Sequence, residues 1–286
     1  MKSFASITEV DNNTVMIVDA LNLAFRYLHG KKKTFAEEYL ATVDSLRKSF
    51  KAGKVVIACD KGSSEYRKNL LPTYKSGRKE KQATQTPEEE ANFKNFIEEF
   101  NRAMELAEGN SKYTFFRFHK CEADDIAAYI ARKVEEAIRT KGADIKIVLV
   151  STDEDWDLLM APHVMRFAYT TKKEITYDNW DNHYDYPPGD HISVKCLTGD
   201  SGDSIPGVPG IGPVKARNLV REYGSTYDIA ASLPISSRYK YIASLNDFGA
   251  DSLILNYKLM DLVTHCHQAL GAKNCQTIDL WMESWI

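Results

Sequence analysis

The sequence has no long apolar segment and few cysteines. No run approaches the ~18 consecutive apolar residues that a membrane-spanning helix needs. The first residues, MKSFASITEVDNN, include no apolar core of the kind found in a signal peptide. The 5 cysteines are scattered and odd in number, which argues against a disulfide framework. We therefore expect a protein of a reducing cytoplasm that has no membrane contact.

Glycine and proline are also scarce. The chain of 286 residues has 15 glycines and 9 prolines, which excludes a collagen-like or a largely disordered protein. Hydrophobic residues make up 43% and charged residues 27%, as in an ordinary folded protein. The length allows one large domain or two smaller ones, each with a core of its own.

The net charge of −3 gives no sign of a nucleic-acid partner, but the charges are unevenly distributed. Between Lys61 and Lys81 there are seven basic residues and two acidic ones. Two smaller basic clusters are Arg26 with Lys31–Lys33, and Lys215 with Arg217 and Arg221. Each cluster is either a solvated surface or a surface that binds a polyanion.

Short apolar runs alternate with helical patterns in the first two thirds of the chain. Strands are predicted at 14–19, 54–60, 112–118 and 145–153, and helices at 34–50, 87–107 and 122–140. Apolar runs of this kind are typical of strands buried in a parallel sheet. We therefore predict an α/β fold, with a mostly parallel sheet flanked by helices over residues 1–185. Residues 186–286 have no strong strand pattern and are predicted to form a helical region.

Acidic residues follow these predicted strands. Asp19, Asp60 and Asp153 each end an apolar run, and the carboxyl ends of parallel strands lie on one edge of a sheet. Further acids stand on the next loop, at the start of the 122–140 helix and in the segment TGDSGD: Asp155, Glu122, Asp124, Asp125, Asp200 and Asp203. Up to nine carboxylates could therefore line one pocket.

Such a cluster calls for a compensating positive charge. Carboxylates held close together repel and raise one another's pKa, and the neighbouring sequence has no matching cation at each position. Oxygen-only ligand sets favour Mg²⁺ or Mn²⁺ over zinc. Two such ions about 4 Å apart form a site that cleaves phosphodiesters.

Other chemistries are poorly supported. A haloacid-dehalogenase-type phosphatase needs an acid where Leu21 stands, and neither a P-loop nor a nucleophile elbow is present. His265, Cys266 and His267, with Cys275 nearby, do not have the spacing of a standard zinc site. We interpret these four residues as ordinary packing.

Residues 207–216, GVPGIGPVKA, predict a tight turn between two helices. Its glycines allow backbone N–H groups to approach a phosphate, and the second helix presents its N-terminus. Such a turn binds the nucleic-acid backbone without reading the base sequence.

Seven segments in this order resemble the structure-specific 5′-nucleases, or flap endonucleases, and most closely the small bacteriophage type without a polymerase. They are IVDALNLAFR, ACDKG, LPTYKSGR, EADD, STDEDWDLL, TGDSGD and GVPGIG. The resemblance implies a PIN-like nuclease core, a helical arch at about 70–105 and a helix–three-turn–helix at about 198–221. Residues 70–86 have no apolar periodicity, so we expect a mobile loop there or a helix that orders on binding.

The resemblance also implies an activity. Members of this family cleave branched DNA near a junction between single and double strands, releasing 5′ flaps, and they act as 5′→3′ exonucleases that remove RNA primers. The protein would therefore be a phosphodiester hydrolase of phage DNA replication, in the host cytoplasm, and a monomer. It would use two Mg²⁺ ions, which Mn²⁺ could replace, and a K⁺ ion at the helix–three-turn–helix.

Residue roles follow from the matched motifs. Asp19, Asp60, Glu122 and Asp124 match the first metal site, and Asp125, Asp153, Asp155, Asp200 and Asp203 match the second, with Asp124 as a bridge. Tyr74, Lys75 and Arg78 match the base of the arch, with Lys75 nearest the scissile phosphate, and Arg26 matches a basic residue close by. The expected DNA contacts are Gly207, Gly210, Gly212, Lys215, Arg217, Arg67 and Lys79.

One departure from the family is Glu154, an extra acid beside the second metal site. Two alternatives use the same fold. A non-catalytic DNA-junction binder would have lost one or more acids, yet every expected acid is present. A PIN-type ribonuclease would lack the features at 61–90 and 198–221.

Overall fold

The computed structural model describes residues 10–78 and 84–286. The predicted arch at about 70–105 is therefore described on both sides of residues 79–83, and Lys79 lies outside the described residues. No helix in the described ranges is long and apolar enough to cross a membrane.

Six strands form one sheet in the order β3-β2-β1-β4-β5-β6. Their bounds are β1 Asp11–Asp19, β2 Ala52–Ala58, β3 Thr114–Phe116, β4 Lys146–Val150, β5 Val164–Ala168 and β6 Lys173–Thr176. All neighbours are parallel except β5 and β6. The predicted mostly parallel sheet is confirmed. The sequence analysis missed β5 and β6, because their short runs alternate with charged residues.

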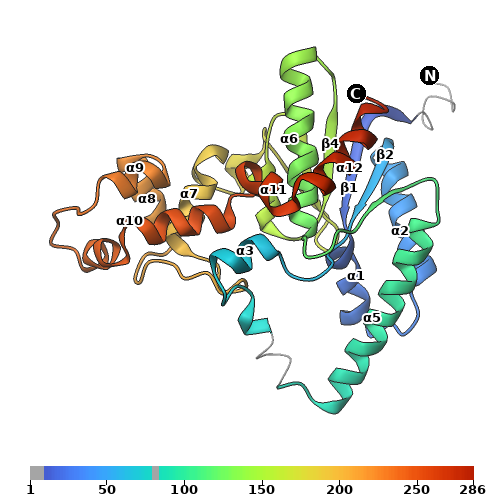
Figure 1. Cartoon of the computed structure of the whole chain (residues 1–286), viewed down its shortest axis with the longest axis horizontal. Helices are drawn as coiled ribbons and strands as arrows, with labels where there is room; N and C mark the ends of the chain where they lie inside the picture. The colour runs from blue at the N-terminus through green and yellow to red at the C-terminus, as the bar shows by residue number, and fades with distance from the viewer. Residues whose placement is uncertain (1–9, 79–83) are drawn as a thin grey trace.

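Helices cover both faces of the sheet (Figure 1). Alternate residues of β1 point in opposite directions: Val15 and Ile17 pack under α6 Ala123–Lys141, whereas Met16 and Val18 pack against α1, α2 and α5. The bounds of these three helices are α1 Ala20–His29, α2 Ala36–Ser49 and α5 Pro87–Glu108. Burial on both faces explains why the strand sequences are continuously apolar.

Local signals set the helix ends. Thr86 and Glu89 form a capping box at the start of α5, with Pro87 as the first helical residue. Gly142 ends α6 in the left-handed conformation, with φ of 66°.

The rest of the chain is helical and extends to one side of the sheet (Figure 1). It contains α7 His191–Thr198, α8 Pro213–Tyr223, α9 Thr226–Ala231 and α10 Lys240–Met260, which share a core of their own. The last helices, α11 Leu262–Leu270 and α12 Ala272–Glu283, return to the sheet and pack beside α6. Shorter helices are α3 Glu65–Leu70 and the 3₁₀ helices η2 Glu154–Leu159, η3 Trp180–Asn182 and η4 Pro188–Asp190. The division near residue 185 stays a prediction.

A buried ion pair supports the loop after β4. The Arg166 guanidinium donates two hydrogen bonds to Asp157, at 2.5 and 2.7 Å, and a third to the Ser151 carbonyl. Asp157 is 1% exposed and also accepts from the Tyr184 hydroxyl at 2.5 Å. The pair therefore fixes the segment that carries Asp153 and Asp155.

We expect Asp157→Ala to lower the free energy of unfolding by about 3–5 kcal/mol, because it leaves the Arg166 charge buried and unpaired. Urea denaturation measures this, with the exposed Asp251→Ala as a control. The double variant Asp157→Leu/Arg166→Met should be less destabilised than Asp157→Ala. A loss below about 1 kcal/mol in Asp157→Ala would contradict the interpretation.

Candidate active site

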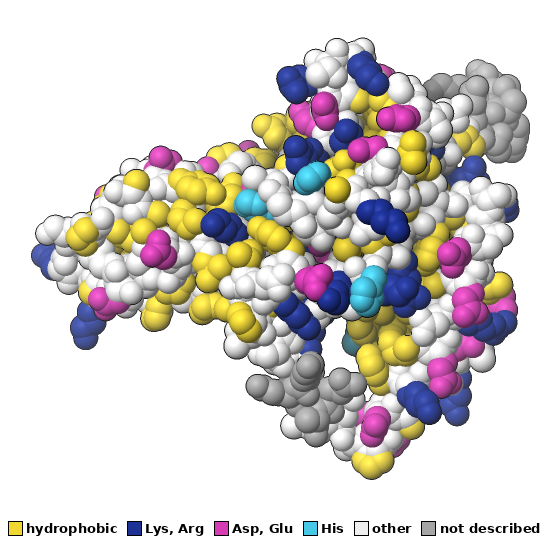
Figure 2. All heavy atoms as spheres, viewed as in Figure 1, with side chains coloured by type: hydrophobic (Ala, Val, Ile, Leu, Met, Phe, Trp, Pro, Cys, Tyr) yellow, Lys and Arg dark blue, Asp and Glu magenta, His cyan; other side chains and the backbone are white. Residues whose placement is uncertain are grey.

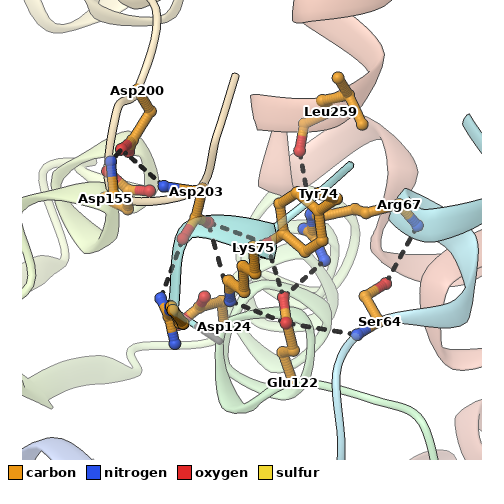
Figure 3. Close-up of polar contacts among 12 residues, drawn as sticks. Ser64, Arg67, Tyr74, Lys75, Glu122, Asp124, Asp155, Asp200, Asp203 and Leu259 are labelled. Atoms are coloured by element: carbon orange, nitrogen blue, oxygen red, sulfur yellow. Dashed lines mark hydrogen bonds and ion pairs between the residues drawn. The ribbon is translucent and has the colours of Figure 1, made fainter. Parts of the chain in front are cut away.

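The predicted acids gather at the carboxyl edge of the sheet. Asp19 ends β1 and caps α1, Asp60 follows β2, and Asp153 caps η2 after β4. Glu122 precedes α6, and Asp200 and Asp203 come from the loop after α7. Figure 3 shows Glu122 and Asp124 from the start of α6, Asp155 from η2, and Asp200 and Asp203 from the loop after α7 in one region. The topology alone explains why acids so far apart in the sequence meet there.

Four of these carboxylates lie in surroundings that disfavour their charge. Burial, the Asp60 charge and the Asp153 charge raise the pKa of Asp19 to about 8, although Ser151 donates a hydrogen bond to it at 2.8 Å. Burial also raises the pKa values of Asp60, Asp124 and Asp153. Mutual repulsion adds to the effect: Glu122 acts on Asp60, and Asp153 acts on Asp124. Lys75 lowers the pKa values of Asp60 and Asp124, but it does not offset burial and repulsion.

The pKa of Glu122 is shifted in the opposite direction, below its ordinary value. Burial disfavours its charge, but Lys75 and Arg67 outweigh burial and lower its pKa. Its carboxylate accepts from the Lys75 ammonium at 2.7 Å, the Tyr74 hydroxyl at 2.9 Å, and Arg67 and the Ser64 N–H at 3.3 Å (Figure 3). Glu122 is therefore ionised and held in place from several sides.

The segment 74–78 is fastened to the loop that carries Asp203. The Lys75 N–H donates to the Asp203 carbonyl at 2.9 Å, and Lys75 has a left-handed φ of 58°. The Tyr74 hydroxyl and the Arg78 guanidinium each lie 2.9 Å from the Asp203 carboxylate. Tyr74, Lys75 and Arg78 also line a pocket of about 470 Å³ with Asp60 and Glu122. The structure thus brings together the predicted arch base and part of the acid cluster.

Lys195 of α7 is a site residue that the sequence analysis missed. Its ammonium hydrogen-bonds to Asp155 at 2.5 Å and lies 3.8 Å from Asp200. It therefore supplies positive charge between two acids assigned to the second metal site. A lone lysine within a helix gives no sequence signal for this role.

Arg67 and Asp125 are two predicted residues that bind each other in the interior. Arg67 is 4% exposed, so its position is incompatible with the DNA contact that we predicted. It donates to both oxygens of Asp125, each at 2.8 Å, and to the Leu259 carbonyl at 2.9 Å. Asp125 is fully buried and both its oxygens are engaged, so it is not available to a metal in this arrangement. The sequence misled here because a motif does not say which residues of a helix face the interior.

Arg26 also lies away from the pocket lining. Its guanidinium stacks on the rings of Tyr27 and Tyr169 and donates to the Thr42 hydroxyl at 2.7 Å. These contacts fix Arg26 between α1, α2 and the end of β5. Its predicted role near the scissile phosphate stays a prediction.

The glycine turn packs tightly against α7. A side chain at Gly207 would place its Cβ 2.0 Å from the Thr198 carbonyl oxygen, so only glycine fits. Gly210 has a φ of 79°, and Gly212 caps α8. The Lys215 ammonium donates to the Gly210 carbonyl at 2.8 Å, and Arg217 pairs with Asp185. The turn has the predicted form, while its contact with DNA stays a prediction.

The acid cluster suits hydrated divalent cations. Among residues 10–78 and 84–286, no three Asp, Glu, His or Cys side chains converge closely enough to form a ready-made metal site. The donors are all oxygens, however, and four carboxylates have raised pKa values that a cation would lower. Mg²⁺ retains several of its waters and so needs few direct protein ligands. The residues present therefore fit this class of ion.

A sheet with an acidic edge, a lysine and a tyrosine set among the acids, and a glycine turn nearby define a nuclease-type fold. Residues 14–185 match the model of the 5′-3′ exonuclease N-terminal resolvase-like domain, and residues 186–281 match the 5′-3′ exonuclease C-terminal SAM fold. The chain belongs to the 5′-3′ exonuclease family, which confirms the resemblance.

Among its relatives is the flap endonuclease of Escherichia phage T5, which is 39% identical over 267 residues, or 93% of this chain and 89% of the relative. The flap endonuclease Xni of Shewanella baltica strain OS155 is 26% identical over 93% of this chain and 96% of its own. A solved structure of the T5 enzyme, a pseudo-enzyme-product complex with DNA and metal ions, has a TM-score of 0.87 at 36% identity and covers 95% of this chain and 98% of its own. Another T5 structure carries zinc as a divalent metal ion.

We expect the metal-free protein to lose stability as the pH rises from about 4 to 8. The pKa of Asp19 is higher in the folded protein than its ordinary value of 3.8, so its contribution is complete below that value and is lost as the pH rises through about 8. In EDTA at pH 8, Asp19→Asn should raise the free energy of unfolding by about 2 kcal/mol. Mg²⁺ should stabilise the wild type more than this variant.

Urea denaturation across this pH range measures both effects, with the exposed Asp144→Asn as a matched control. If Asp19→Asn and Asp144→Asn followed the same pH dependence, the assignment of Asp19 as an uncompensated buried acid would be wrong.

Proposed function

We propose that this chain is a structure-specific DNA 5′-nuclease that hydrolyses phosphodiesters near junctions between single and double strands, as flap endonuclease and 5′→3′ exonuclease. The observation that carries the proposal is the meeting of two groups in one site. Carboxylates with raised pKa values, Asp60 among them, lie beside a cationic segment that Glu122 and Asp203 hold in place. A DNA-binding protein without catalysis has no need of acids held where burial and mutual repulsion disfavour their charge.

The metal ligands divide between the two sides of the site. We assign Asp19, Asp60, Glu122 and Asp124 to one ion, and Asp153, Asp155, Asp200 and Asp203 to the other. Mg²⁺ is the proposed ion, with Mn²⁺ able to replace it. When bound, such a pair supplies an activated water and stabilises the leaving oxygen.

The protein's own cations act on the phosphate. Lys75 is 9% exposed and opens onto the pocket, so its charge is little screened by water. Glu122 and Asp203 raise the pKa of Lys75 against the effect of burial, so the ammonium keeps its proton. The fixed ammonium of Lys75 would offset the negative charge that develops on a scissile phosphate beside it in the transition state. Tyr74 and Arg78 hold the same segment to Asp203 and keep Lys75 in position.

The remaining parts would hold the DNA. We assign duplex phosphates to the turn at 207–216, with Gly207, Gly210, Gly212, Lys215 and Arg217, and with a K⁺ ion on backbone carbonyls. The single strand would meet the segment around Lys75 and Arg78. Substrates would be 5′-flap DNA and RNA–DNA hybrids, in phage DNA replication, and the enzyme would act as a monomer.

A 5′-labelled flap substrate tests the function directly. In Mg²⁺ we expect a short labelled product that maps to the junction, and in EDTA we expect none, because the acids then lack their cations. Asp153→Asn/Asp155→Asn should bind the junction but not cleave it, whereas the exposed Asp144→Asn should cleave normally. Tight binding without cleavage by the wild type, in Mg²⁺ and in Mn²⁺, would favour the junction binder instead.

Lys75→Ala should lower the single-turnover cleavage rate about 10²–10³-fold at similar affinity, because it removes a cation that acts mainly in the transition state. The exposed Lys48→Ala, on α2, is the matched control. A Lys75→Ala enzyme that cleaves at the wild-type rate would remove Lys75 from the mechanism.

A further inference from the structure

Arg117 follows β3 and lines the same pocket as Asp60, Lys75 and Arg78. Its Nε donates to the Asp60 carbonyl at 3.4 Å, and one terminal nitrogen donates to the Asn101 side chain of α5 at 3.2 Å. Two separate elements therefore orient the guanidinium at the pocket wall.

Arg117 differs from the neighbouring cations in that no carboxylate is paired with it. Lys75 is paired with Glu122, and Arg78 is paired with Asp203. Within the described part of the chain, no carboxylate lies within 4.0 Å of the Arg117 guanidinium, whose recorded partners are neutral. The same is true of Lys68, which comes from α3 and lines the same pocket. Both cations are therefore able to pair with an anion from outside.

The rest of the pocket indicates the kind of anion. Leu21 and Ile97, with the mostly buried Phe100 beside them, give it an apolar wall that an unpaired base could contact. The pocket of about 470 Å³ is large enough for a nucleotide. An apolar wall beside two cations matches one nucleotide with its phosphate.

We propose that Arg117, assisted by Lys68, binds the phosphate next to the scissile phosphate, and that this contact sets the scissile phosphate against Lys75. The inference rests on the proposed nuclease function and assigns a second phosphate subsite within its pocket. Arg117 is a substrate-positioning residue here. Its hydrogen bond to the Asp60 carbonyl links the subsite to an acid of the first metal site.

Flap substrates with a single neutral methylphosphonate test the subsite. Each phosphate within three positions of the cleavage site is replaced in turn, and kcat/KM is measured for the wild type and Arg117→Ala. We expect Arg117→Ala to lower kcat/KM about 10–100-fold on the normal substrate, as for loss of a charged hydrogen bond. Neutralising the phosphate next to the scissile one should lower the kcat/KM of the wild type by a similar factor. The same change should lower the kcat/KM of Arg117→Ala by less than about 2-fold.

Two further measurements show whether Arg117 binds a phosphate or only supports the fold. The slope of log affinity against log salt should fall by about 0.7 in Arg117→Ala, the value for one phosphate on a single strand. Arg117→Lys, which keeps the charge, should regain part of the activity. The exposed Arg139→Ala, in the last turn of α6, is the matched control and should resemble the wild type.

Two results would overturn the inference while leaving the proposed function intact. One is an Arg117→Ala enzyme within about 2-fold of the wild type. The other is a loss that multiplies with the methylphosphonate effect at every position, which would mean that Arg117 only supports Asp60 or α5. If Arg117→Ala fails to fold, Arg117→Gln, which keeps a donor but no charge, carries the same test. A wild type that cleaves no flap would remove the proposed function and this inference with it.

Discussion

The ion pairs around Glu122 hold the site together. One carboxylate at the start of α6 binds the backbone before α3, the arginine of α3, and the tyrosine and lysine of the segment that follows. The attraction is strong because these groups are buried, where water screens charge poorly. Arg67 extends the network to Asp125 and to the Leu259 carbonyl near the end of α10. The sheet, the arch base and the C-terminal helices therefore meet at one buried cluster of charge.

The charges of the site are compensated unevenly. Glu122 is neutralised by Lys75 and Arg67, and Asp155 by Lys195, whereas burial and mutual repulsion raise the pKa values of Asp19, Asp60 and Asp124. We therefore expect the internal cations to support the fold without metal, and the acids with raised pKa values to create the affinity for it. The apolar strands stabilise the folded chain, and the acids at their carboxyl ends are left without enough positive charge beside them.

Much of this arrangement could be predicted from the sequence. Asp19, Asp60 and Asp153 were found because each ends a buried strand, and parallel strands end on one edge. Arg67 and Asp125 were misplaced because a motif gives the identity of a residue but not the face of the helix on which it lies. Lys195 and Arg117 were missed for a different reason. Each lies in a helix or after a short strand without a pattern of its own, and only packing brings it to the acids.

The glycine turn belongs to one piece of backbone with Asp200 and Asp203, two of the acids assigned to the second ion. Val208 and Leu197 are joined by a backbone hydrogen bond at 2.9 Å, Asp200 pairs with Ile205 in a short bridge, and Gly207 lies against Thr198. No flexible side chain intervenes between the turn and Asp200. The few residues between them would hold a duplex bound on this turn at a fixed distance from the acids. The main chain would then set the position of the cleaved phosphodiester, whatever the base sequence of the DNA.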